Sequence, residues 1–326
     1  MSEAKPPRKT KKNALAHRYV DMWAFMGVHP TNIEFLQRLK MADDRQFGAN
    51  MDVCGTVSEK DLKNGTWEKA YLVGIRTDAW NPSEDQQQAR LKTLQNEREV
   101  QLRKQIKSSG PLSSKQMERW QKKLVRDPIM RMQPRDLESR RLVMKLFRTT
   151  SERMRWTGTI EEMVTREIHN SLGSRRAVLT FATILNQHGY LTLLQENHRT
   201  FRIPSIFTFC YCHEKSGRLW YVNIKRKWIS IGADFTVEAE GRKIGEIDGA
   251  LIGFGYNAHV CVYEPELAGD NQFLDLLTLF AASVGYQGEM RRSVKKRLSA
   301  SRRGLAGQQI VEAEEFLLLT NPRKAA

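Results

Sequence analysis

The 326-residue sequence lacks most of the features that indicate a particular chemistry. It contains neither GxSxG, HExxH nor a P-loop, and its 7 histidines are scattered without a paired spacing. No secretory apolar segment is recognisable near the N-terminus, which leads us to expect a reduced, cytoplasmic setting. The sequence therefore shows no catalytic constellation, and it predicts neither a metal nor a cofactor.

Cysteine is scarce, and the closest pair gives only a weak metal signal. The 4 cysteines are Cys54, Cys210, Cys212 and Cys261. Cys210-Tyr-Cys212-His213 resembles part of a ligand set, but no second pair follows at a zinc-like spacing. Residues i and i+2 of a strand point to one face, so we interpret Cys210 and Cys212 as small buried strand residues.

Long apolar runs are also missing. The longest, from residue 273 to residue 286, carries Asp275 and is shorter than the roughly 20 residues that cross a bilayer. The sequence therefore predicts no transmembrane span.

Positive charge is abundant. Lysine and arginine number 53 against 37 acidic residues, which gives a formal net charge of +16. Such an excess favours an anionic partner, either nucleic acid or an acidic membrane surface. The alternative is a solvated basic protein whose charge only aids solubility.

The N-terminal part predicts a tail and a small α+β module. Residues 1–13 are basic without apolar periodicity, which is typical of disorder. Within residues 14–80, the segments 14–28 and 30–42 indicate helices, and the segments 51–57 and 66–75 indicate strands.

Residues 81–175 predict a basic helical region. A polar helix is expected over 83–107, a second begins at Ser113 with Gln116 completing a capping box, and a third is capped by Thr159 and stopped by Gly173. Interleaved basic and aromatic residues over 83–156 suit nucleic acid, but they also suit amphipathic helices whose basic stems cover apolar surface. The candidate nucleic-acid contacts are Arg119, Trp120, Lys122, Lys123 and Arg126.

The chain after residue 176 predicts a β-barrel. About nine short strands are expected after residue 188, separated by glycine-containing turns. Gly232 and Gly241 mark two reversals, where a positive φ or a bulge is cheap. Apolar residues at odd positions define the expected buried face: Ile229, Ile231, Phe235, Val237 and Ala239.

A helix that is apolar on nearly every face follows at 272–287, with Asp270 or Asn271 as its cap. Such a helix must be surrounded by protein. A helix of ~16 residues spans about 24 Å, the height of a small barrel. The predicted fold is thus α+β, with an antiparallel barrel over 176–290 around this helix and a mostly helical basic region before it.

The succession RLWYVNIKRKWISIGADFTVEAEGRKIGEIDG, a further hairpin and a C-terminal apolar helix resembles the tubby C-terminal-like superfamily over residues 188–288. The closest pattern is that of the LURP-one-related and phospholipid-scramblase group. The resemblance implies twelve antiparallel strands around a hydrophobic helix and binding to anionic phospholipid headgroups. Scramblase-type calcium ligands and a cysteine-rich palmitoylation segment are not recognisable, so it does not extend to scrambling.

A basic corner and a basic tail supply the predicted binding residues. The tail, 291–326, opens with RRSVKKRLSASRR and ends with a short amphipathic helix. We expect a non-enzymatic protein that binds an anionic surface, foremost phospholipid, by peripheral contact; the alternative is nucleic-acid binding through 83–156. The predicted anion-binding residues are Lys225, Arg226, Lys227, Arg291, Arg292, Lys295, Lys296 and Arg297.

Overall fold

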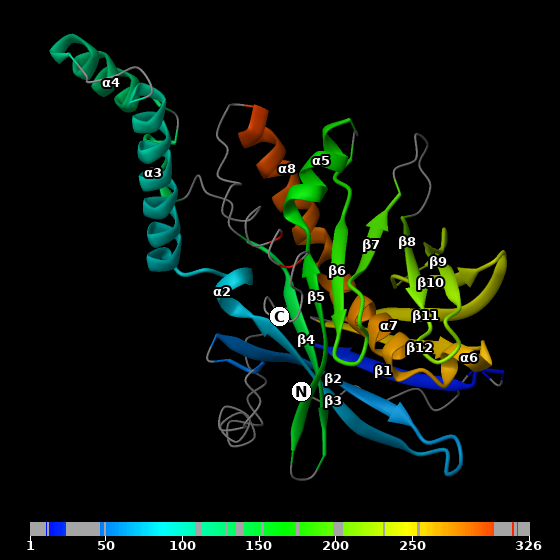
Figure 1. The fold of residues 1–326 in the computed structure, drawn as a ribbon. Coiled ribbons are helices and arrows are strands. Elements are labelled where there is room, and N and C mark those ends of the chain that lie inside the picture. Colours follow the sequence, from blue (N-terminus) through cyan, green and yellow to red (C-terminus); the bar gives the residue numbers. More distant parts are fainter. Residues whose placement is uncertain are drawn as a thin grey trace.

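Twelve antiparallel strands close a barrel in the computed structural model (Figure 1). The structure describes residues 11, 13–23, 46–48, 50–107, 113–127, 129–134, 140–150, 153–173, 176–197, 205–230, 232–252, 255–302, 315 and 318. Each strand pairs with its neighbours in chain order, and β1 pairs with β12 to close the ring. The predicted antiparallel barrel is therefore confirmed.

The strands of the barrel range from 5 residues in β7 and β10 to 11 in β11. They are β1 (Ala16–Met22), β2 (Met51–Lys60), β3 (Trp67–Arg76), β4 (Val143–Thr149), β5 (Met154–Glu162), β6 (Thr180–Leu185), β7 (Thr192–Glu196), β8 (Ile206–Cys212), β9 (Leu219–Arg226), β10 (Phe235–Ala239), β11 (Arg242–Ile252) and β12 (Gly255–Val262).

The barrel includes residues that the sequence assigned to other regions. Strands β1 to β3 come from residues 14–80, and β4 and β5 come from residues 81–175. These parts are therefore not a separate module and a wholly helical region, and the predicted start of the barrel at residue 176 is too late. The helix expected over 14–28 is wrong where it is described: β1 alternates, with Arg18 facing inward and His17 outward. The helix expected over 30–42 and most of the 1–13 tail lie outside the described residues.

The strand count after residue 188 also differs from the expected nine, since the described part of the chain has six there, β7 to β12. Two of the expected short strands are parts of the single long strand β11. Another was expected over 228–232, but Trp228, Ile229 and Ser230 lie in a connection after β9. The strand expected over 200–203 lies outside the described residues. The expected alternation holds for Phe235, Val237 and Ala239, which are buried, whereas Ile231 lies outside the described residues.

The apolar helix predicted at 272–287 fills the barrel. It is α7 (Asn271–Ser283), capped by Asp270 and extended by the 3-10 turn η3 (Val284–Tyr286). Every side chain from Phe273 to Ser283 is buried, and α7 contacts β1, β4, β5, β6 and β12. None of the described helices combines the length and apolar composition needed to cross a bilayer.

The two ends of the barrel differ. We call the end where β6 and β8 begin the α8 end, because α7 leaves the barrel there and continues into α8 (Gln287–Arg302), near α5 (Val164–Leu172) (Figure 1). The opposite, hairpin end carries the β8–β9 and β10–β11 turns and α6 (Pro265–Ala268). At the β10–β11 turn, Gly241 has a φ of 77°, as predicted for a reversal.

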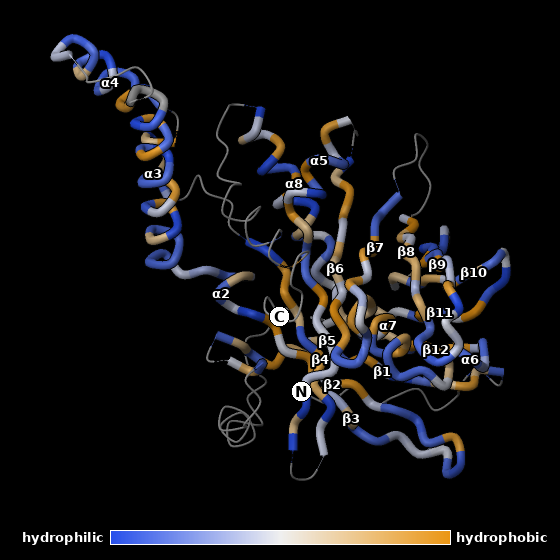
Figure 2. The backbone as a smooth tube through the Cα atoms, in the orientation of Figure 1, coloured by the Kyte–Doolittle hydropathy of each residue, from blue (hydrophilic) through white to orange (hydrophobic). Residues whose placement is uncertain are grey.

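Between β3 and β4 the chain forms α2 (Thr77–Trp80), α3 (Glu84–Lys107) and α4 (Ser114–Arg126). The last two project away from the barrel and are largely hydrophilic (Figures 1 and 2). Both were predicted, and the capping box of Ser113 and Gln116 is present. The third predicted helix begins later than expected, at Val164, because Thr159 belongs to β5.

A buried ion pair joins α7 to the barrel wall. The Arg18 guanidinium, from β1, donates to the Asp275 carboxylate on α7 and, over 2.7 Å, to the Tyr71 hydroxyl on β3. All three side chains are at most 2% exposed. Burial disfavours the charged guanidinium, but the neighbouring Asp275 carboxylate outweighs it and raises the pKa of Arg18. Burial raises the pKa of the Asp275 carboxyl, and the neighbouring Arg18 guanidinium opposes that rise. The contact fixes the helix against the first strand.

We expect Asp275→Leu alone to destabilise the fold by about 3–5 kcal/mol, because it removes the buried carboxylate and leaves Glu59, at 3.3 Å, as the guanidinium's remaining acidic partner. The double variant Arg18→Met/Asp275→Leu should recover much of that loss. Urea denaturation of the two single variants and the double variant measures the coupling. Lys122→Met, which breaks the exposed pair with Glu118, serves as the control and should change stability by less than about 1 kcal/mol. Additive effects of the two core substitutions would contradict this account.

Candidate functional site

The predicted basic corner lies where β9 ends, at the α8 end of the barrel. Lys225 forms an ion pair with Glu238 on β10. Arg226 is exposed, and Lys227 is half-buried with its backbone N–H bonded to the Asp234 carbonyl at 2.9 Å. The corner therefore presents positive charge at the base of the β9–β10 connection.

Two apolar side chains follow this corner directly. Trp228 is 75% exposed and Ile229 is 94% exposed. The prediction that Ile229 faces the core is wrong, because β9 stops at Arg226 and the alternation of the barrel wall no longer applies. We call residues 225–229 the basic-aromatic loop.

The connection is anchored behind its exposed tip. Gly232 packs so closely on Gly249 that a Cβ atom would lie 1.7 Å from the Gly249 carbonyl oxygen. Gly232 is thus required for close approach, and not for the positive φ that we had considered. The Asp234 carboxylate accepts from the Gly249 N–H at 2.8 Å, and the Ser230 hydroxyl accepts from the Asp234 N–H at 3.1 Å. These contacts fix the connection so that Trp228 and Ile229 point outward.

The predicted basic residues of α8 divide into two groups. Arg291 makes a bidentate contact with Glu196, at 2.7 and 2.8 Å, and Arg297 donates to the buried Glu162 carboxylate at 3.1 Å. These two side chains hold α8 on the barrel. Exposed side chains make up the second group: Arg292, which pairs with Glu289, Lys295 and Lys296.

The corner and α8 meet at one residue, Ser205. Arg291 lies 3.3 Å from the Ser205 hydroxyl, and the Ser205 carbonyl accepts from the Arg226 N–H at 2.9 Å. Two basic segments that are about 65 residues apart in the sequence are therefore neighbours at the α8 end.

The alternative nucleic-acid residues lie on α4. An open hollow is lined by Arg119, Lys122, Lys123, Arg126 and Asp127. Trp120 is only partly exposed, and the Arg103 guanidinium lies 5.3 Å from its ring centroid. Trp156 packs against the core and donates to Thr159 at 3.0 Å. Neither indole is therefore displayed as a stacking platform for bases.

The predicted burial of Cys210 and Cys212 is wrong. Cys210 is exposed and Cys212 is half-buried on the outer face of β8.

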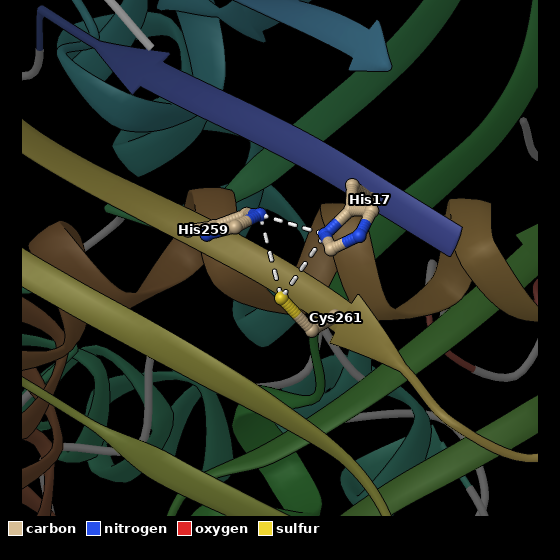
Figure 3. Close-up of side chains that lie close together, drawn as sticks. All are labelled: His17, His259 and Cys261. Carbon is tan, nitrogen blue, oxygen red and sulfur yellow. Dashed lines mark hydrogen bonds between the residues drawn. The ribbon is translucent and has the colours of Figure 1, made fainter. Parts of the chain in front are cut away.

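Cys261 on β12 lies close to His17 on β1 and His259 on β12, and all three are buried (Figure 3). Sequence reasoning missed this cluster because it placed His17 on a helix. The i, i+2 spacing of His259 and Cys261 on a strand was the available signal.

Comparison with protein-family models, with curated proteins and with solved structures gave no match for this chain. The functional interpretation consequently depends on the residues and their geometry.

Two buried carboxyl groups, those of Glu162 and Glu167, lie next to each other near α8. Glu167, on α5, is fully buried, and burial together with the neighbouring Glu162 raises its pKa well above the usual range. The Thr180 N–H donates to Glu167 at 3.0 Å, and Arg297 donates to Glu162. Burial therefore favours the neutral form of Glu167, while Glu162 is the carboxyl group that faces Arg297.

Glu167→Gln should preserve the neutral form and gain stability relative to the parent chain as pH rises. A group with a raised folded-state pKa stabilises below its unfolded pKa, near 4.5, and that contribution is lost as pH rises through the folded value. Urea denaturation at pH 5 and pH 8 tests this, with Glu162→Gln as the matched control. The control should be destabilised at both pH values. A relative loss of stability for Glu167→Gln at higher pH would contradict the assignment.

Proposed function

We propose that this protein binds anionic phospholipid surfaces without catalysing a reaction, through the α8 end of its barrel. The observation that carries the proposal is the composition of the basic-aromatic loop. The exposed Arg226 and the half-buried Lys227 lead directly into the exposed Trp228 and Ile229, beside Lys225, which pairs with Glu238. A headgroup layer offers both the negative charge and the apolar boundary that this loop would contact.

The two halves of the loop match the two layers of a membrane surface. Basic side chains near an anionic leaflet contribute about 1 kcal/mol each, and tryptophan favours the boundary between headgroups and acyl chains. Exposed Trp228 and Ile229 have no apolar cover among the described residues, so shallow insertion would remove their surface from water. Charge and insertion together give the two signals that stable peripheral binding needs.

Helix α8 widens the proposed surface. Its exposed cations Arg292, Lys295 and Lys296 stand at the same barrel end as the loop. Arg291 and Arg297, which the sequence placed in the same set, are occupied by Glu196 and Glu162. We therefore assign to them the attachment of α8 rather than contact with lipid.

The resemblance to tubby-like barrels is consistent with this proposal. It implied twelve antiparallel strands around a hydrophobic helix near the C-terminus, and the chain has a closed twelve-strand barrel around α7. We propose membership of that superfamily on the strength of this shared architecture. Since a fold does not by itself imply a function, the lipid proposal depends on the loop and not on the resemblance.

Nucleic-acid binding is the second candidate, and one observation favours it. Four basic side chains surround the open hollow on α4, where they could contact phosphates. We rank it below lipid binding because Trp120 and Trp156 are only partly exposed, so neither presents an open ring face on which a base could stack.

Flotation of the nuclease-treated full chain with phosphatidylserine-containing and neutral vesicles tests the proposal. We expect binding to the anionic vesicles only. Arg226→Gln/Lys227→Gln should weaken it by about 30-fold, because two charges contribute about 2 kcal/mol. Trp228→Ser/Ile229→Ser should weaken it by at least about 10-fold through lost apolar contact.

Matched variants control for charge and for exposed apolar surface. Arg119→Gln/Lys123→Gln removes two charges from α4, and Leu219→Ser/Tyr221→Ser removes two exposed apolar side chains from the start of β9 at the hairpin end. Both should float like the parent chain. Absence of flotation, together with salt-releasable nucleic acid on the chain before nuclease treatment, would refute the lipid proposal and favour the second candidate. Flotation that depends on the α4 pair alone would contradict the proposed binding surface.

A further inference from the structure

We propose that His17, His259 and Cys261 form a binding site for a zinc-class divalent cation that links the first strand of the barrel to the last. The inference is independent of lipid binding, because the cluster lies on the outer face of β1 and β12 and shares no residue with the basic-aromatic loop.

Strand pairing brings the three side chains together. His17 on β1 is the direct cross-strand partner of Cys261 on β12. His259 lies two residues before Cys261, so both point to the same face of β12. Figure 3 shows the two imidazoles and the thiol converging from these strands. Paired strands fix the position of each Cβ atom, so the donor set is largely preorganised.

The distances between the donor atoms match the edges of a tetrahedral site. His17 Nδ1 lies 3.1 Å from His259 Nε2, and Cys261 Sγ lies 3.5 Å and 3.4 Å from these two nitrogens. A tetrahedral zinc ion with ordinary bond lengths separates two nitrogens by about 3.3 Å and a nitrogen from a sulfur by about 3.6 Å. Each observed distance is within about 0.2 Å of these values, so an ion could enter without rearrangement of the strands.

Hydrogen bonds among the two imidazole nitrogens and the thiol satisfy these three atoms poorly. An imidazole nitrogen carries either one proton or one lone pair in the ring plane. A hydrogen bond between His17 Nδ1 and His259 Nε2 therefore uses both nitrogens, and the Cys261 thiol has no free lone pair left on either. A cation at the centre would instead accept one lone pair from each of the three atoms.

The surroundings keep the histidines in the form that binds metal. Burial lowers the pKa of His17 and lowers the pKa of His259 to about 4, so both rings are neutral at physiological pH. The Trp67 ring contacts both imidazoles edge-on, with centroid distances of 6.4 and 5.6 Å. Burial also raises the pKa of Cys261 to about 12, so metal binding would have to displace the thiol proton.

We expect a water molecule as the fourth ligand, because the nearest carboxylate is paired with two lysines. Glu246 on β11 is the cross-strand neighbour of Cys261, and it favours a cation electrostatically. Its carboxylate is already paired with Lys11, at 2.9 Å, and with Lys243. Lys11 and Lys60 oppose the bound charge, which the thiolate of Cys261 offsets in part. A site with two imidazoles, one thiolate and one water has the donor softness that zinc prefers.

Metal binding at this place would stabilise the closure of the barrel. His17 and Cys261 are 244 residues apart in the sequence, and they lie on the two strands whose pairing closes the ring. An ion held by both strands restrains the chain between them, and its binding free energy adds to the folding free energy.

Cobalt(II) substitution of the full chain tests the site. We expect tetrahedral d–d bands in the visible region and a thiolate-to-cobalt charge-transfer band, with zinc abolishing both by competition. Cys261→Ser should abolish the charge-transfer band, and His259→Gln should weaken zinc binding by more than about 100-fold, since loss of an outer-shell partner alone costs 10–100-fold. Cys210→Ser, at an exposed cysteine outside the cluster, is the matched control and should retain the parent spectrum.

Thermal melting of the parent chain keeps the proposal testable if a variant fails to fold. Zinc should raise the melting temperature of the parent chain and a chelator should reverse the rise. Absence of a thiolate–cobalt band in the folded parent chain would overturn the proposal. So would loss of that band in Cys210→Ser together with its retention in Cys261→Ser.

Discussion

The fold depends on a helix that cannot be exposed to water. The side chains of α7 from Phe273 to Ser283 are buried on every face, so the chain must surround this helix with strands. The ion pair between Arg18 and Asp275 then sets how α7 sits, because a buried charge on the helix requires its partner on β1. The first strand, the last strand and the helix thus determine one another, although they come from opposite ends of the sequence.

Closure around α7 also produces the proposed binding surface. Because the helix enters at the hairpin end and leaves at the opposite one, α8 must stand beside the connections that reverse the chain there. Arg291 and Arg297 attach α8 to the wall, which leaves its other cations pointing outward. The anchored base of the β9–β10 connection leaves Trp228 and Ile229 no core to enter. The same packing that buries α7 therefore places charge and exposed apolar surface together.

The sequence predicted those parts of the fold whose signal is local. The apolar helix, the alternation around Phe235 and the capping box at Ser113 each depend on neighbours within a few residues, and all three are present. The sequence predicts a helix at β1 because neither pairing partner is local: β2 lies more than 30 residues away and β12 more than 200. A run of basic residues likewise cannot show which side chains face carboxylates, so Arg291 and Arg297 could not be separated from Lys295. The exposure of Trp228 and Ile229 and the grouping of two histidines with Cys261 can be recognised only from the tertiary structure.

Hydrogen–deuterium exchange of the full chain, with and without phosphatidylserine-containing vesicles, tests the central claim most directly. The account predicts new protection in the peptide that covers residues 226–234, with additional protection along α8 and no change in α4. Protection confined to α4, or to the hairpin end of the barrel, would contradict the assignment of the binding surface. Unchanged exchange throughout the chain in the presence of the vesicles would contradict phospholipid binding itself.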